Sequence, residues 1–391
     1  MRRALSPRVL AQILLGGLGM AMLLWALLVD RGWFETHLAE HYCANDWGAQ
    51  LQSWASWRVA GAGCGVFLVA LVVPIGRWVG RRSWGCLMPV ARIAVAVVLA
   101  LVVSDLWLRR RPPPPPGPVI LPDVRPDARY GWLNDGPRTT HILTDGRDIV
   151  YAMNARGERV ADEHDLPDLD RPTLLVAGES ISSAMGVQWE DSFAALIGKA
   201  TGLQVVDAGV FGWGHDQVYA RMKDELTELR HPVAVVSVTV AQQIDRDVSP
   251  TRTHLELAGD GSLFPVTAQP AWWLDSPLRA LAKQLMPYHS DRALAIARAL
   301  VAATASEARA HGAYPLFVLT NWGRACLPDE SGAPSVQRRL FGGLDVPFVR
   351  VDLDPSWEDR TTFHPDARGH RLLADAILRA LVDAKVIHPP P

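Results

Sequence analysis

Three short stretches of the chain carry residue types that could do chemistry together: a serine, flexible glycines and a histidine. Ser180 stands in a Gly-Glu-Ser run directly after the apolar segment Thr-Leu-Leu-Val-Ala, where its hydroxyl would be presented at the end of a strand. Gly209 follows a second apolar segment, and a glycine N–H at that place can donate to an oxyanion. His364 precedes an amphipathic segment near the C-terminus, where a loop can hold an imidazole as a base.

Each stretch also has a purely structural interpretation when it is taken alone. Ser180 could serve only as a helix cap, and the glycines around Gly209 could form a plain turn. A single histidine such as His364 is often structural, and His370 is a weaker candidate because it falls inside the expected last helix. The chemistry therefore depends on whether the fold brings these residues together.

The elements expected around these residues predict an α/β domain. From Arg171 onward, short apolar runs alternate with segments of helical period, which indicates a parallel sheet with helices on both faces. Chemistry in such sheets gathers at the carboxyl ends of the strands, where Ser180 and Gly209 would both lie. The predicted strands are 173–177, 204–207, 233–240, 314–320 and 347–352, and the predicted helices are 192–201, 217–230, 291–311 and 366–384.

Together, the three stretches resemble the SGNH, or GDSL, hydrolase family, from about Arg171 to the end of the last helix. Ser180 is similar to the family's nucleophile, Gly209 to its oxyanion glycine and His364 to its catalytic histidine. The Asp-Ala-Gly-Val-Phe-Gly run around Gly209 is similar to the version found in membrane-anchored bacterial members. The resemblance implies a flavodoxin-like three-layer fold with a five-stranded parallel sheet. It also implies a serine esterase or acyl hydrolase, with the Ser180 N–H as a further oxyanion donor.

Three positions depart from the family's pattern. Glu179 stands where the family usually has an aspartate, and Gln242 begins a Gln-Gln pair where an Asn-Asp pair is usual. The Gln242 amide could still donate to an oxyanion. Threonines occupy the places of the usual aspartate before the histidine. The nearest acids are Asp359 and Glu358 before it and Asp366 after it, and Asp359 is the candidate acid partner for His364. These departures keep two alternatives open: a catalytically degenerate domain that binds a glycan or a partner, and an O-acyltransferase component.

The N-terminal part of the chain is predicted to lie in a membrane. Stretches at about 9–29, 57–77 and 87–108 are apolar, and roughly 20 apolar helical residues cross a bilayer core of ~30 Å. A cleaved signal peptide is the alternative for the first stretch, although the run is longer than a typical signal. The predicted organisation is a membrane region at 1–111, a Pro-rich linker at 112–122, a lead-in segment at 123–170 and the hydrolase-like domain at 171–391.

The charges of the connecting loops predict which side the main domain faces. Arginines precede the first apolar stretch and lie between the second and third, which favours a cytoplasmic N-terminus. The resemblance to bacterial family members implies that the membrane is a bacterial inner membrane. Three crossings then place the domain in the periplasm or outside the cell. The run Arg109–Arg111 disagrees with this orientation, and the domain would face inward if the third stretch did not cross.

Composition limits the partners that we expect. The formal net charge is −2 and the chain has no long basic run, so nucleic-acid binding has little support. The four cysteines form no CxxC pair or Cys/His cluster, and no phosphate-binding glycine loop is found, so we expect neither a metal nor a cofactor. The expected partners are the membrane and an acylated small molecule, glycan or lipid as substrate.

Overall fold

The computed structural model describes residues 7–28, 47–79, 123–250, 252–268, 291–321, 333–359, 361–362 and 364–388. The chain forms two compact units, an N-terminal one and a larger α/β one, and each is considered by itself. The third predicted membrane stretch, 87–108, and the Pro-rich linker, 112–122, lie outside the described residues.

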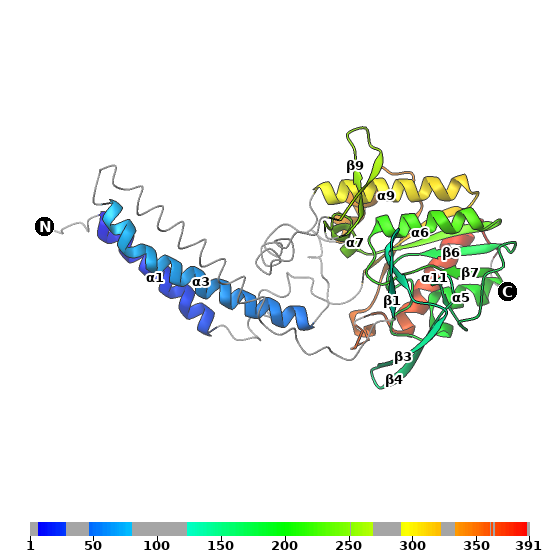
Figure 1. The fold of residues 1–391 in the computed structure, drawn as a ribbon, viewed down its shortest axis with the longest axis horizontal. Coiled ribbons are helices and arrows are strands. Elements are labelled where there is room, and N and C mark those ends of the chain that lie inside the picture. The colour runs from blue at the N-terminus through cyan, green and yellow to red at the C-terminus, as the bar shows by residue number, and fades with distance from the viewer. Residues whose placement is uncertain are drawn as a thin grey trace. The chain divides into compact units, whose positions relative to one another are not determined.

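In the N-terminal unit, two helices pack along each other: α1 (Pro7–Leu28) and α3 (Trp47–Val79) (Figure 1). Their backbones approach closely at Gly19 and Gly65, where a Cβ on either glycine would lie 2.8 Å from the carbonyl oxygen of the other. Small residues of this kind let apolar helices pack closely where no hydrophobic force drives them together.

Apolar composition is a feature of both helices. The stretch Trp57–Pro74 in α3 has the length and composition to cross a bilayer, and the apolar stretch Gln12–Leu28 in α1 is shorter. In the isolated chain, large apolar side chains of α1, among them Leu14 and Leu27, are exposed. A signal sequence or a buried helix can share this length and composition, so the membrane spans stay a prediction.

In the part of the larger unit that the structure describes, eight strands form the central sheet. Within the described residues their spatial order is β12-β11-β8-β6-β7-β5-β4-β3, and the five from β12 to β7 run parallel. Their bounds are β3 (Arg138–Thr144), β4 (Arg147–Met153), β5 (Arg159–Val160), β6 (Thr173–Ala177), β7 (Gln204–Asp207), β8 (Pro232–Thr239), β11 (Tyr314–Asn321) and β12 (Phe348–Asp352).

The sheet is larger than the five strands expected from the sequence. Strands β3, β4 and β5 come from the predicted lead-in segment, 123–170, and they join the sheet antiparallel beside β7. The bridge between Arg159 and Asp207 connects the two parts. An uncovered edge strand is prone to unwanted pairing, and β5 covers part of the β7 edge. The lead-in segment, 123–170, therefore supplies strands to the main sheet.

Helices cover both faces of the sheet, and α5 and α11 share a core on one face while α6 and α9 pack on the other. The five predicted strands and four predicted helices are confirmed, each within two residues of its expected bounds.

The helices are α5 (Phe193–Thr201), α6 (His215–Glu228), α7 (Ala241–Arg246), α9 (Asp291–Ala310), α10 (Ala333–Phe341) and α11 (Ala367–Asp383), with 3-10 turns η3 (Trp189–Asp191) and η4 (Pro355–Trp357). Two hairpins complete the described elements: β1 (Val124–Asp127) with β2 (Gly131–Asn134), and β9 (His254–Leu257) with β10 (Leu263–Val266).

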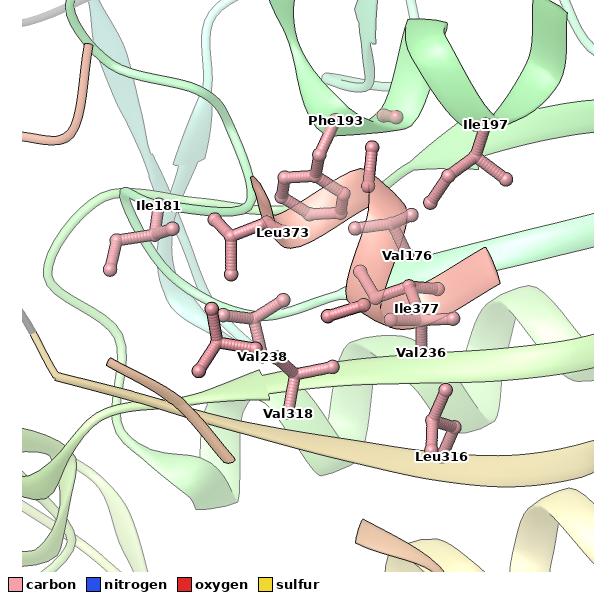
Figure 2. Close-up of a cluster of buried hydrophobic side chains, with 14 of the residues drawn as sticks. Val176, Ile181, Phe193, Ile197, Val236, Val238, Leu316, Val318, Leu373 and Ile377 are labelled. Carbon is pink, nitrogen blue, oxygen red and sulfur yellow. The ribbon is translucent and has the colours of Figure 1, made fainter. Parts of the chain in front are cut away.

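The core holds β6 firmly, which matters because Ser180 follows that strand. Alternate residues of a strand point to opposite faces, so Val176 packs with α5 and α11 whereas Leu175 packs toward α6. Figure 2 shows Val176 among side chains of both helices, including Phe193 and Ile377. Burying one such side chain stabilises the fold by roughly 1.5–3 kcal/mol, so the end of β6 is a rigid support.

Candidate active site

Ser180 lies on a tight turn at the carboxyl end of β6. Gly178 permits this turn, because a Cβ there would lie 2.0 Å from Ser182 Oγ and 3.0 Å from the Val238 carbonyl. The Ser180 carbonyl accepts hydrogen bonds from the Met185 N–H and from Ser183 Oγ, both at 3.1 Å. The serine is only 2% exposed, so its position is fixed by the turn that follows it.

His364 meets Ser180 from the other end of the domain's sequence. Its Nε2 lies 2.7 Å from Ser180 Oγ, and its Nδ1 lies 2.6 Å from the Thr362 carbonyl oxygen. A carbonyl can only accept, so Nδ1 carries the proton, and the lone pair of Nε2 faces the serine hydroxyl. Burial lowers the pKa of His364, an effect that the nearby negative charge of Glu179 opposes. The imidazole is therefore neutral and set to accept a proton near pH 7.

Asp359, the predicted acid partner of His364, has a different place in the structure. Its Oδ1 accepts hydrogen bonds from the N–H groups of Thr361 at 2.9 Å and Thr362 at 2.7 Å. Its own N–H donates to the His364 carbonyl at 2.8 Å, and Arg147 lies 3.3 Å from its Oδ2. The prediction is corrected here, because the carboxylate is used to close the loop while a backbone carbonyl receives the Nδ1 proton.

Gly209, the predicted oxyanion donor, also has a different partner. Its N–H donates to Asp207 Oδ1 at 3.0 Å, so it is not free to bind an oxyanion in this structure. The residue must nevertheless be a glycine, because a Cβ would lie 2.6 Å from the Ser183 nitrogen. Its role as an oxyanion donor stays a prediction, and in this structure Gly209 lets the Ser180 turn pack against the end of β7.

Gln242 and the Ser180 N–H are the other two predicted oxyanion donors. Gln242 lies in the first turn of α7, partly exposed, and its side chain has no hydrogen-bond partner among the described residues. The Ser180 N–H has no acceptor within the same described part of the chain. The adjacent Gln243 is used structurally, since its Oε1 accepts from the Val240 N–H at 3.0 Å.

Glu179 and Arg246 form a buried ion pair beside the serine, which sequence reasoning did not assign to the site. Glu179 Oε2 lies 2.7 Å from Ser180 Oγ and 2.9 Å from Arg246 Nη1. Burial by itself would raise the pKa of Glu179, but the positive charge of Arg246 and the other contacts hold it below its usual value. The only sequence signal was the unusual glutamate before Ser180, and nothing marked Arg246 at the end of α7 as its partner.

Arg159 fixes the chain that follows the serine. This arginine is 1% exposed, and its guanidinium donates to the carbonyls of Ser183, Ala184 and Val187. It also lies over the ring of Tyr151, 4.1 Å from the centroid. The turn contains a left-handed residue, Ala184, with φ of 51°. A buried cation that binds three carbonyls holds this strained turn in place.

Two other histidines near the site have structural contacts. His370 is buried in α11, stacks on Phe193 and accepts the Phe193 N–H at its Nδ1, 3.3 Å away. Burial lowers the pKa of His370 to about 3, so it stays neutral. His215, at the start of α6, lies 2.8 Å from the Asp247 carboxylate, which follows α7. These contacts join the helices around the site.

A separate cavity of about 170 Å³ lies by β5 and β7, and its lining includes Glu158, Trp189 and Asp207. Neither Ser180 nor His364 lines it. Among the described residues, no group of three or more His, Cys, Asp or Glu side chains could hold a metal ion.

Comparison with known proteins gives similarities of fold. No family model and no curated protein matches the sequence. Similar solved structures include one named as a lipolytic protein of the G-D-S-L family from Desulfitobacterium hafniense, with 11% identity and a TM-score of 0.33, covering 54% of this chain and 99% of that one. An acetyl xylan esterase from Butyrivibrio proteoclasticus has 15% identity and a TM-score of 0.32, covering 57% of this chain and 66% of that one. A salicylyl-acyltransferase from a tetracycline biosynthetic pathway has 15% identity and a TM-score of 0.30, covering 58% and 59%. A likeness of fold does not show an activity, so the possible chemistry follows from the residues around Ser180.

Proposed function

We propose that the chain is an SGNH-type serine esterase, an acyl hydrolase in which Ser180 is the nucleophile and His364 the base. The observation that carries this proposal is the 2.7 Å contact between Ser180 Oγ and His364 Nε2, at the carboxyl end of a central parallel strand. The Nδ1 proton is directed to the Thr362 carbonyl, so the nitrogen that faces the serine is the one able to accept its proton.

The proposed reaction follows the usual steps of nucleophilic acyl transfer. His364 Nε2 takes the Ser180 proton as Oγ bonds to the ester carbonyl carbon, and the carbonyl oxygen becomes an oxyanion. The Ser180 N–H and the Gln242 amide are the proposed donors to this oxyanion. The imidazolium then returns the proton to the leaving alcohol. A water molecule, activated by His364, releases the acyl group from Ser180 in the second half of the reaction.

The burial of Ser180 and His364 favours a short acyl group. The two residues are 2% and 9% exposed, which leaves little open surface for a long chain at the reacting atoms. We therefore propose that the substrate is an ester of a short acid, such as an acetyl ester, on an envelope glycan or lipid. Rates on nitrophenyl acetate, butyrate and octanoate test this point, and a preference for octanoate would contradict it.

We propose that the N-terminal helices anchor the domain in a bacterial inner membrane, with the domain on the outer side. The apolar stretch of α3 and the exposed leucines of α1 support an anchor, and the arginine distribution supports the orientation. Cysteines placed on the domain should react with a membrane-impermeant maleimide in intact spheroplasts. Protection until the membrane is opened would show that the domain faces inward.

The proposed activity is tested with the full chain in detergent and nitrophenyl acetate as substrate. Ser180→Ala should lower kcat by at least ~10³-fold, because it removes the atom that forms the acyl-enzyme. Ser192→Ala is the matched control, since this buried serine caps α5 and touches neither reacting residue. It should reduce stability by about 1 kcal/mol and leave kcat near the wild-type value.

Two other outcomes of this assay distinguish the alternatives. An acyltransferase would make the same acyl-enzyme but give ester product when an acceptor alcohol or sugar is added, whereas a hydrolase gives the free acid. Equal, background-level rates in the wild type and in Ser180→Ala, with both proteins folded, would favour a binding domain without catalytic activity.

A further inference from the structure

The Ser180 hydroxyl lies between two acceptors, and it has one proton to give. Oγ is 2.7 Å from His364 Nε2 and 2.7 Å from Glu179 Oε2. In the resting site the proton can point to either side. Both contacts together fix the position of Oγ, and they place the Glu179 carboxylate within two hydrogen-bond lengths of the reacting nitrogen of His364.

Glu179 carries a full negative charge at this place. The residue is 2% exposed, and a buried carboxylate stays ionised only when a cation pairs with it. Arg246 supplies that cation from α7 at 2.9 Å. Arg246 is itself held by its backbone, since its carbonyl accepts a hydrogen bond from Arg252, which forms an ion pair with Asp216.

Among the other described groups around His364, none offers an equivalent charge at the reacting atoms. Asp359 faces the imidazole from the preceding loop, but its carboxylate binds two backbone N–H groups and lies 3.3 Å from Arg147 of β4. On α11, His370 stays neutral because burial keeps its pKa low. From α7, Arg246 opposes a positive charge on His364. The Thr362 carbonyl orients Nδ1 but is uncharged.

We propose that Glu179 is the acid of this catalytic centre, in place of an aspartate bonded to Nδ1. It holds the Ser180 hydroxyl for attack and offsets, through space, the positive charge that forms on His364 when the serine proton moves to Nε2. Arg246 is a positioning residue in this arrangement, because it keeps Glu179 ionised. This inference rests on the proposed esterase function, and its test includes a measurement that needs no turnover.

The first test substitutes Glu179 and follows the titration of His364. Glu179→Gln keeps the shape of the side chain and removes its charge. The pKa of His364 should then fall by about one pH unit or more, because an opposite charge is lost and Arg246 is left without its partner. NMR of the full chain in detergent, with isotope-labelled histidine, measures this pKa, and the spectrum of His364→Asn identifies the signal. Glu179→Asp keeps the charge and should keep the pKa near the wild-type value.

The second test reads the same change in catalysis. In Glu179→Gln the acidic limb of the kcat/KM profile should move to lower pH, and the plateau should fall by roughly 10- to 100-fold. Glu179→Asp should restore most of the rate. The matched control is Glu225→Gln, which neutralises another buried, arginine-paired carboxylate that contacts neither Ser180 nor His364. This substitution should lower the free energy of unfolding but leave the acidic limb of the kcat/KM profile at its wild-type pH.

The His364 pKa and ester hydrolysis are independent readouts, so the inference and the esterase function can fail separately. An unchanged His364 pKa in Glu179→Gln excludes Glu179 as the charge partner, whether or not the protein hydrolyses esters. A wild type without ester hydrolysis, but with the expected pKa shift, contradicts only the function. Arg246 is 34% exposed on its side chain, so water can solvate it when Glu179 is neutral. Should Glu179→Gln unfold, Glu179→Gln with Arg246→Met removes both charges, and a smaller downward shift is expected.

Discussion

The buried carboxyl of Asp207, at the end of β7, should make the stability of the fold depend on pH. This residue is fully buried, its Oδ1 accepts the Gly209 N–H, and its Oδ2 has no partner among the described residues. Burial raises the pKa of Asp207 from 3.8 to about 8, although the Gly209 N–H and the charge of Arg159 oppose the rise. The folded protein therefore holds a proton that the unfolded chain releases.

The size and sign of the effect follow from these two pKa values. The unfolded chain loses the Asp207 proton near pH 4, whereas the folded protein keeps it until about pH 8. Stability is then greatest below pH 4 and falls as the pH rises through this window, because the folded state binds the extra proton. One pKa unit corresponds to ~1.4 kcal/mol, so this group alone should remove roughly 4 kcal/mol between pH 4 and pH 7.

Asp207→Asn tests this expectation directly. Asparagine is neutral and of equal size, and its Oδ1 can still accept the Gly209 N–H. Urea unfolding of the full chain in detergent, followed by tryptophan fluorescence, gives the free energy of unfolding at each pH. The variant should match the wild type near pH 4 and be more stable by a few kcal/mol at pH 8. Parallel pH dependence in the two proteins would refute the assignment of a protonated Asp207.

Three further substitutions or measurements test the site. Arg159→Met should lower the free energy of unfolding by roughly 3–5 kcal/mol, because it leaves three buried carbonyls without their donor. An unchanged midpoint in urea titration would show that these bonds are unimportant. The pH profile of kcat/KM should have its acidic limb below pH 6.5, because burial lowers the pKa of His364, and a limb above 6.5 would contradict that. Gly209→Ala should reduce both the melting temperature and the reactivity of Ser180, because its Cβ would lie 2.6 Å from the Ser183 nitrogen. A fully reactive and stable alanine variant would show that this close approach is not needed.

The sequence predicted the strands well because buried parallel strands are continuous apolar runs with clear ends. Strands β6 and β7 begin and end at the expected residues, so the carboxyl-end rule placed Ser180 and Gly209 at one edge of the sheet. The position of His364 before an amphipathic helix was also informative, and the structure brings it to Ser180. Local patterns thus located both reacting side chains.

Hydrogen-bond partners were harder to predict, because they depend on residues far apart in the chain. Asp359 was close enough in sequence to serve His364, but its carboxylate is taken by the N–H groups of its own loop. Arg159 and Arg246 both contact the Ser180 turn, although they lie 21 residues before Ser180 and 66 after it, and no local motif marks either one. The sequence did not predict that β3, β4 and β5 join the main sheet, because the bridge between Arg159 of β5 and Asp207 of β7 pairs residues far apart in the chain.

Covalent labelling of the full chain with a fluorophosphonate probe, followed by peptide mass spectrometry, tests the central claim most directly. The probe reacts with a serine only when a base activates it, so labelling reports the Ser180–His364 pair and needs no knowledge of the substrate. We expect the adduct on Ser180 in the wild type and in Ser192→Ala, and its loss in His364→Ala. An unlabelled wild type that is folded, or an adduct on a different serine, would contradict the assignment of Ser180 as the nucleophile.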